Sequence, residues 1–242
     1  METMTQQRKA NNTWSKYRDR IHTKSEPIDD EAIVCDDTQE RRECRKRWKA
    51  ERPEYNRLEL LALDLKIAKV ILTSTRPSDL YGCYIHSELC EWDLHSEKHA
   101  RQWGLSKAQE RSIADRKEAV VLISREYDPE NTLRRTLAHE IGHHICHLAK
   151  FTPEQLNASV TKMMRRFFPA DIYLKRQKSQ EEFHSECFAE YLTVSAIKHG
   201  IKRECEAILS RVRRHSPDAA TLVEQYRKTL LERTRRTGTP RE

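Results

Sequence analysis

The sequence predicts an α+β protein that is mostly helical and contains a small sheet. Apolar residues recur at steps of three and four between residues 55 and 72 and between 133 and 148, which is typical of helices that bury one face. Two short segments, 80–86 and 119–124, are rich in β-branched and aromatic residues, which is typical of strands. Further helices are expected at 38–51, 105–116, 153–168, 180–198, 201–213 and 217–235.

Three parts that differ in composition are expected along the chain. Residues 1–54 contain almost no apolar clusters and are predicted to form a charged flexible arm. Residues 55–200 hold both predicted strands and most of the apolar periodicity, so we expect them to form the main folded domain. Residues 201–242 are predicted to form a C-terminal helical extension with a basic tail, in which Pro217 separates two helices.

The composition argues against several classes of protein. The 242 residues are 34% charged and 37% apolar, and the net charge of +7 arises from mixed charges along most of the chain. Seven cysteines, an odd number without a CxxC pair, argue against a disulfide framework and a zinc ribbon. No apolar run approaches the ~20 residues of a membrane span, so we expect a soluble cytoplasmic protein.

The helix expected after Asp128 and Pro129 contains His139, Glu140 and His143 in an HExxH sequence. Asp128 is a suitable N-cap, and Pro129 suits the first helical position. Two histidines four residues apart lie about 40° apart around a helix axis, so both imidazoles can reach one cation. The opposite side of this helix carries an apolar stripe, which consists of Leu133, Leu137, Ile141, Ile145 and Leu148.

This spacing predicts a catalytic zinc site. Zinc accepts neutral imidazole nitrogens, prefers four ligands, and leaves one position to water in catalytic sites. We therefore predict that His139 and His143 bind Zn²⁺. Glu140 lies about 100° from His139 around the helix, so its carboxylate can reach a water molecule without displacing it. Glu140 is therefore predicted to be the general base.

A third ligand is expected from the helix that begins near residue 180. Glu182 and Glu186 are four residues apart and share one side of that helix. We predict that Glu182 binds the zinc and that Glu186 accepts a hydrogen bond from the second ring nitrogen of His139. Glu186, Glu181 and His184 remain alternative ligands, and a solvated acidic helix face remains the alternative without chemistry.

Several side chains near these motifs have more than one candidate role. His144 and His147 are expected on the helix surface or behind the metal ligands, because one straight helix cannot surround an ion with three histidines. The strand at 119–124 either borders the substrate cleft or is an ordinary core strand. The candidate oxyanion donors are Tyr191, His184 and His199. The cysteines that could block the open zinc position are Cys83, Cys90, Cys146 and Cys187, for each of which a buried apolar role is the alternative.

Two segments resemble the ImmA/IrrE-type metallopeptidases. The first is T-L-A-H-E-I-G-H-H at 136–144, and the second is E-F-H-S-E-C-F-A-E-Y-L at 182–192. Phe188, Ala189 and Leu192 match the second family motif, and Glu182 falls on its third-ligand position. Ser185-Glu186 replaces the usual Ala-Asn, as in a thermolysin-like ExxxD arrangement, and Thr193-Val194 replaces Met-Pro. The resemblance implies a zincin-like metallopeptidase core over 55–200, with a small sheet beside the active-site helix.

The resulting expectation is a zinc-dependent endopeptidase that cleaves a specific intracellular protein. The resemblance implies a transcriptional repressor of the helix-turn-helix type as the candidate substrate. The first alternative is a non-catalytic zinc-containing protein that binds a regulator or, through its basic ends, nucleic acid. The second alternative is a zinc hydrolase that acts on a non-peptide amide.

Overall fold

The computed structural model describes residues 38–73, 75–76, 80–86, 102–109, 119–126, 132–150, 180–194 and 199–236. These residues form an α+β structure that is mostly helical, as predicted. Its elements are α2 (Thr38–Asp64), β1 (Lys69–Thr73), β2 (Gly82–Ile85), β3 (Val120–Ser124), α5 (Leu133–Leu148), α8 (Gln180–Thr193), α9 (His199–His215) and α10 (Pro217–Arg236).

The sheet has three strands in the order β1-β3-β2. β3 lies in the middle and is buried along its whole length, with β1 parallel and β2 antiparallel to it. Both predicted strands are therefore present, but the strand at 119–124 has a neighbour on each side. It is a core strand and does not offer a free edge to a substrate.

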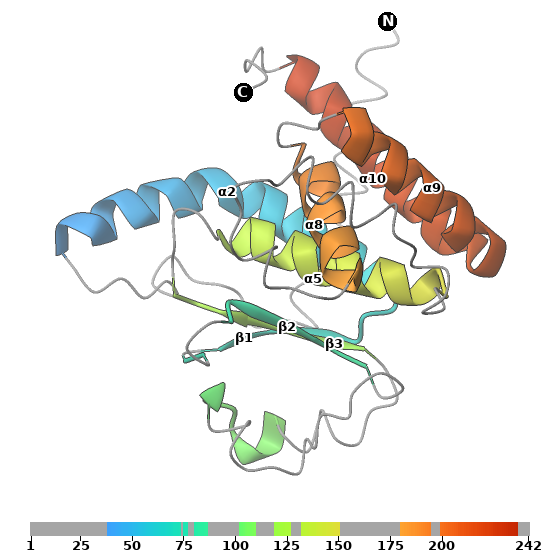
Figure 1. Ribbon diagram of the computed structural model, residues 1–242. Helices are drawn as coiled ribbons and strands as arrows, with labels where there is room; N and C mark the ends of the chain where they lie inside the picture. The colour runs from blue at the N-terminus through green and yellow to red at the C-terminus, as the bar shows by residue number, and fades with distance from the viewer. Residues whose placement is uncertain are drawn as a thin grey trace, which may run out of the picture.

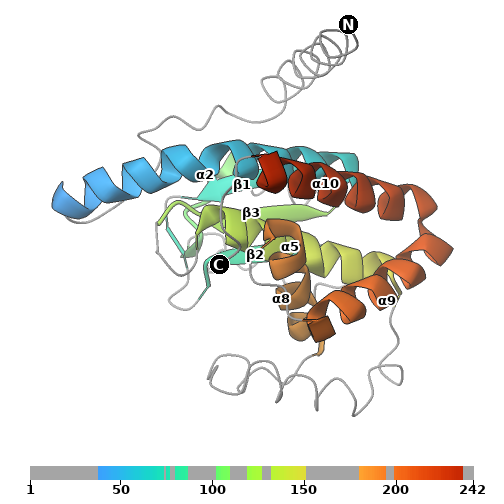
Figure 2. The same cartoon turned by 90° about the horizontal axis from the view of Figure 1, so that it is seen from above.

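The helices α2, α5, α8, α9 and α10 lie on one side of this sheet, and the short segment 102–109 lies on the other (Figure 1). Alternate strand residues such as Val121 and Ile123 pack into the main core beneath the helices. The residues between them, such as Val120 and Leu122, pack with Trp103 from segment 102–109 on the other face. α5 is the central helix, because it contacts α2, α8, α9, β2 and β3. In the view from above, α10 lies beside α2 (Figure 2).

The predicted helices at 38–51 and 55–72 form one helix that ends early. α2 continues through Pro53 and stops at Asp64. Lys66 adopts a left-handed φ of 71°, Lys66 N donates to Leu63 O and Ile67 N donates to Ala62 O, which together form a Schellman motif. The prediction of helix to residue 72 was wrong because residues 69–73 instead pair with β3.

Other helix limits also differ from the sequence prediction. Thr132, rather than Asp128, caps α5, because the Thr132 side chain accepts a bond from Arg135 N. α8 ends at Thr193 instead of 198, where Val194 has a φ of 55°. Ser106 and Gln109 bond reciprocally to each other's backbone N–H groups, so the predicted cap at Ser106 is present. Asp128 and the helix predicted at 153–168 lie outside the described residues.

The core extends beyond the range predicted for the main domain. Trp48 of α2 is fully buried and meets Tyr55 edge to face, with ring centroids 5.4 Å apart. Residues of α9 and α10, among them Val212 and Val223, belong to the same buried cluster. No helix in the described part of the chain is long and apolar enough to cross a membrane.

Trp48→Ala should lower the free energy of unfolding by about 3–5 kcal/mol, because a large buried side chain is lost and leaves a cavity. Urea denaturation followed by circular dichroism measures this change. Lys46→Ala is the matched control, since Lys46 is exposed on the same helix. Equal stability of the two variants would contradict the placement of Trp48 in the core.

Candidate metal centre

The histidines of the HExxH sequence turn their Nε2 atoms toward each other. His139 Nε2 and His143 Nε2 are 3.1 Å apart, and the two rings are nearly perpendicular, with an interplanar angle of 80°. Two nitrogens that bind one tetrahedral zinc at ~2.0–2.1 Å are ~3.3 Å apart. The pair therefore fits a shared zinc ion without a change of backbone. In the absence of a metal, the same two atoms suit a nitrogen–nitrogen hydrogen bond.

A glycine allows α8 to approach this pair closely. A Cβ atom built on Gly142 would lie 2.8 Å from both the Cα and the carbonyl oxygen of Ser185, closer than real Cβ contacts. Because these are backbone atoms, no rotation of a side chain relieves the overlap. Gly142 therefore permits the two helix backbones to meet, and the next residue after Ser185 is Glu186.

Glu186 reaches from α8 to two cationic or polar groups on α5. One carboxylate oxygen lies 2.9 Å from His139 Nδ1, and the other accepts a hydrogen bond of 2.7 Å from Arg135 Nη2. Burial raises the pKa of Glu186, but the hydrogen bond and charge of His139 and the guanidinium of Arg135 outweigh it and lower the pKa to about 2. Glu186 is therefore ionised and holds the Nδ1–H tautomer of His139, which leaves a lone pair on Nε2.

The predicted third ligand, Glu182, belongs to α8, as Glu186 does, but the Glu182 side chain lies outside the described residues. Glu182 lies in the first turn of α8, one helical turn before Glu186. Among the side chains that are described, no group of three or more His, Cys, Asp or Glu residues is arranged to hold a metal. Of the alternative ligands, His184 is buried beside Glu204 of α9 at 3.2 Å, and the side chain of Glu181 is also outside the described set.

Glu140 is buried where the N-terminal half of α5 meets the start of β2. A Cβ atom built on Gly82 would overlap Glu140 Oε1 and would lie 2.7 Å from Thr136 Cγ2. The carboxylate therefore lies directly against the β2 backbone. Glu140 directly follows His139 in α5, so the predicted base shares a helix with the histidine pair and lies against β2.

His144 is buried and contacts both the end of α2 and β2, so of the two positions expected from the sequence the one on the helix surface is wrong. Its Nε2 lies 2.8 Å from Leu65 O at the end of α2, and its Nδ1 lies 2.9 Å from the Tyr84 hydroxyl. Burial lowers the pKa of His144 to about 4, so the ring is neutral near pH 7. Because the carbonyl only accepts, Nε2 carries the proton and Nδ1 accepts from Tyr84.

Sequence reasoning did not find Tyr84. Its ring is nearly parallel to that of His143, with centroids 6.3 Å apart and an interplanar angle of 10°. Its position in β2 alternates with Cys83, which packs on the opposite face of the sheet. The alternation of residues 80–86 already placed Tyr84 and Cys83 on opposite faces of the predicted strand. The sequence did not show which of these faces meets α5, because that depends on the order of the strands in the sheet.

The proposed oxyanion donors in α8 point elsewhere. The Tyr191 ring packs under the Arg227 guanidinium at 4.3 Å, and His184 pairs with α9. His199 and Cys90 have side chains outside the described residues. Cys146 and Cys187 are buried, and burial raises the pKa of the Cys187 thiol well above its ordinary value. The buried role considered for these cysteines therefore agrees with their environment.

No protein-family model, curated protein or solved structure that was compared with this chain matches it.

Gly142→Ala should reduce the free energy of unfolding by roughly 1–3 kcal/mol, because the added methyl group forces α8 away from α5. This outcome opposes the ~1 kcal/mol that alanine normally gains over glycine in a helix. Chemical denaturation measures it, with Gln225→Ala on the exposed side of α10 as the control. A more stable Gly142→Ala protein would show that the helices do not meet here.

Proposed function

We propose that the protein is a zinc-dependent endopeptidase with a zincin-like core. The observation that carries the proposal is the pair of Nε2 atoms 3.1 Å apart on α5, one of whose rings is held from behind by Glu186. A carboxylate that holds the second nitrogen of a metal-binding histidine is a recurrent feature of zinc sites. A solvated helix face would not require this buried arrangement.

His139, His143 and Glu182 would hold the zinc ion in this proposal. When bound, zinc supplies a Lewis acid that lowers the pKa of a coordinated water toward ~7. Glu182 lies one helical turn before Glu186, which contacts His139. The close approach of α8 to His139 therefore supports Glu182 as a ligand. Glu186 keeps its ion pair with Arg135 and orients His139, and it does not enter the ligand set.

Glu140 performs the proton transfers. Its carboxylate accepts a proton from the attacking water, whose oxygen bonds to the scissile carbonyl carbon. The same proton then passes to the amide nitrogen as the carbon–nitrogen bond breaks. Burial against β2 keeps the carboxylate close to the histidine pair and restricts bulk water around it.

The proposed substrate is a specific intracellular protein, with a helix-turn-helix repressor as the candidate implied by the family resemblance. β2 runs beside the HExxH helix and pairs with β3, so this strand borders the candidate centre.

Glu140→Gln should retain bound zinc and lose at least about 100-fold in cleavage rate, because the base is removed while the ligands remain. His139→Ala should lose the metal as well. Elemental analysis gives the zinc content, and gel electrophoresis follows cleavage of a helix-turn-helix repressor and of labelled casein. Normal cleavage by Glu140→Gln, or unchanged zinc in His139→Ala, would rule out these assignments.

Glu182→Ala should lower the zinc content to near that of His139→Ala, because zinc then keeps only two protein ligands. Glu181→Ala is the matched control, since it removes the neighbouring carboxylate from the same helical turn. Equilibrium dialysis against zinc with elemental analysis compares the two variants. Loss of zinc from Glu181→Ala but not from Glu182→Ala would reassign the third ligand.

A further inference from the structure

β2 runs alongside α5 and presents alternate residues to it. Gly82 meets Thr136 and Glu140, and two residues later Tyr84 meets His143 and His144. The next residue of this alternation is His86, whose ring centroid lies 4.1 Å from the ring centroid of His147. The strand therefore follows the helix in the same direction, and each of these positions faces a different turn of the helix.

Position 82 requires glycine because neighbouring side chains leave no room for a Cβ atom, and not because of its backbone conformation. Among the glycines described, the one with a positive φ is Gly104. Any residue could therefore adopt the Gly82 backbone, but a Cβ atom there would overlap Glu140 Oε1 and lie 3.0 Å from Glu140 Cδ. The carboxylate occupies the volume in which every other amino acid would place its Cβ atom.

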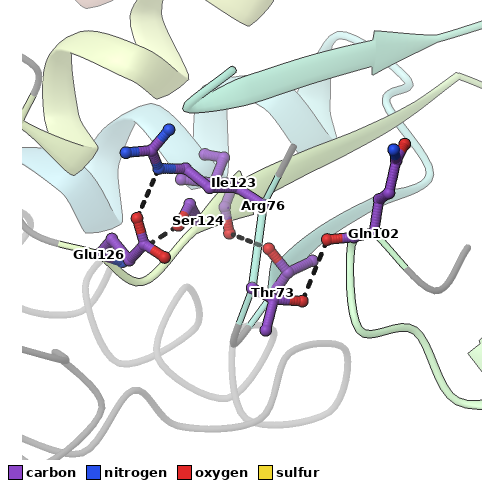
Figure 3. A network of polar contacts seen from close by, with 7 residues as sticks. Thr73, Arg76, Gln102, Ile123, Ser124 and Glu126 are labelled. Carbon is purple, nitrogen blue, oxygen red and sulfur yellow. Dashed lines mark hydrogen bonds and ion pairs between the residues drawn. The ribbon is translucent and has the colours of Figure 1, made fainter. Parts of the chain in front are cut away.

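The start of β2 cannot easily shift to relieve such an overlap. Ser124 N donates to Tyr81 O at 2.9 Å, and the Arg76 guanidinium lies over the Tyr81 ring at 4.1 Å. Arg76 Nε also donates to Glu126 Oε2 at 2.5 Å, and Glu126 N donates to the Ser124 hydroxyl at 3.1 Å (Figure 3). These contacts attach the residue before Gly82 to the end of β3.

Two further contacts support the same end of the sheet. Thr73 Oγ1 donates to Ile123 O at 3.2 Å, and Thr75 Oγ1 donates to Gln102 O at 3.1 Å (Figure 3). Ile123 is also the register partner of Gly82. On the helix side, Thr136 is buried and β-branched, so its methyl group has little rotational freedom. A methyl group added at position 82 therefore overlaps two groups, the end of the Glu140 side chain and the stiffer Thr136 methyl group, and the Glu140 carboxylate is the one that moves more readily.

We propose that Gly82 is a positioning residue that sets the location of the Glu140 carboxylate. The absent Cβ atom provides the place in which the carboxylate rests, against the β2 backbone. Gly82 acts through Glu140 and does not touch the substrate or the metal. This inference rests on the proposed function, since it assigns Gly82 a part in the same reaction.

Gly82→Ala tests the proposal. The displaced Glu140 atom is the end of a flexible side chain, and the second close atom, Thr136 Cγ2 at 2.7 Å, is removed by carrying Thr136→Ser in every protein of this test, so the variant should fold normally and keep its zinc. Because a misplacement of about 1 Å can cost on the order of 100-fold in rate, kcat for labelled casein should fall roughly 10–100-fold while KM changes less than about threefold. Cys83→Ala is the control, since Cys83 lies on the opposite face of β2, and its kcat should match the wild type.

A second pair of variants separates positioning from a general disturbance of the strand. Glu140→Asp shortens the side chain by one methylene and withdraws the carboxylate from Gly82. Gly82→Ala should therefore reduce kcat much less in the Glu140→Asp protein than in the wild type. A merely structural effect of the methyl group would reduce kcat by the same factor in both backgrounds.

The outcomes are distinct. An active wild type whose Gly82→Ala variant keeps kcat within twofold overturns the role of Gly82 and leaves the proposed function intact. Equal losses in both Glu140 backgrounds, or a loss that follows the loss of zinc or of thermal stability, also overturn it. A zinc-loaded wild type that cleaves neither casein nor the repressor overturns the proposed function, and with it any catalytic role for Gly82.

Discussion

The contact between Gly142 and the Ser185 backbone is the constraint on which the rest of the centre depends. Two helices whose backbones meet this closely exclude any side chain at the crossing point. The residues on either side of the crossing are consequently brought into reach, and Glu186 contacts both Arg135 and His139. Without this approach, the acidic face of α8 would remain separated from the histidines by at least one layer of side chains.

Polar groups around α5 are satisfied by elements that are distant in the sequence. His144 joins the carbonyl of Leu65, directly after α2, to a hydroxyl of β2, while Glu186 joins two turns of α5 to α8. His144 is neutral because burial lowers its pKa, whereas Glu186 is ionised because His139 and Arg135 lower its pKa in spite of its burial. Buried polar groups of this kind favour a single arrangement of the helices, because any other leaves them without partners.

The sequence predicted the elements well where local and tertiary preferences agreed. Segments 80–86 and 119–124 became strands, and the stripe from Leu133 to Leu148 became the central helix. The prediction of a helix was wrong at residues 65–72, where leucines continue the helical period. The Schellman motif at Lys66 ends the helix, and the following residues pair with β3 as β1. Trp48 was assigned to a charged arm because its neighbours are charged, although its large apolar side chain is fully buried in the core.

The sequence alone determined the spacing of His139, Glu140 and His143, because a helix of 3.6 residues per turn places two of them on one side wherever it lies. It also indicated Glu186 as an acceptor for His139, and the structure places those atoms 2.9 Å apart. Only the tertiary structure decided which strand meets α5, and thus the parts played by Gly82, Tyr84 and His144. The reason is that strand order and helix crossing arise from contacts between distant segments, which no local pattern of residues encodes.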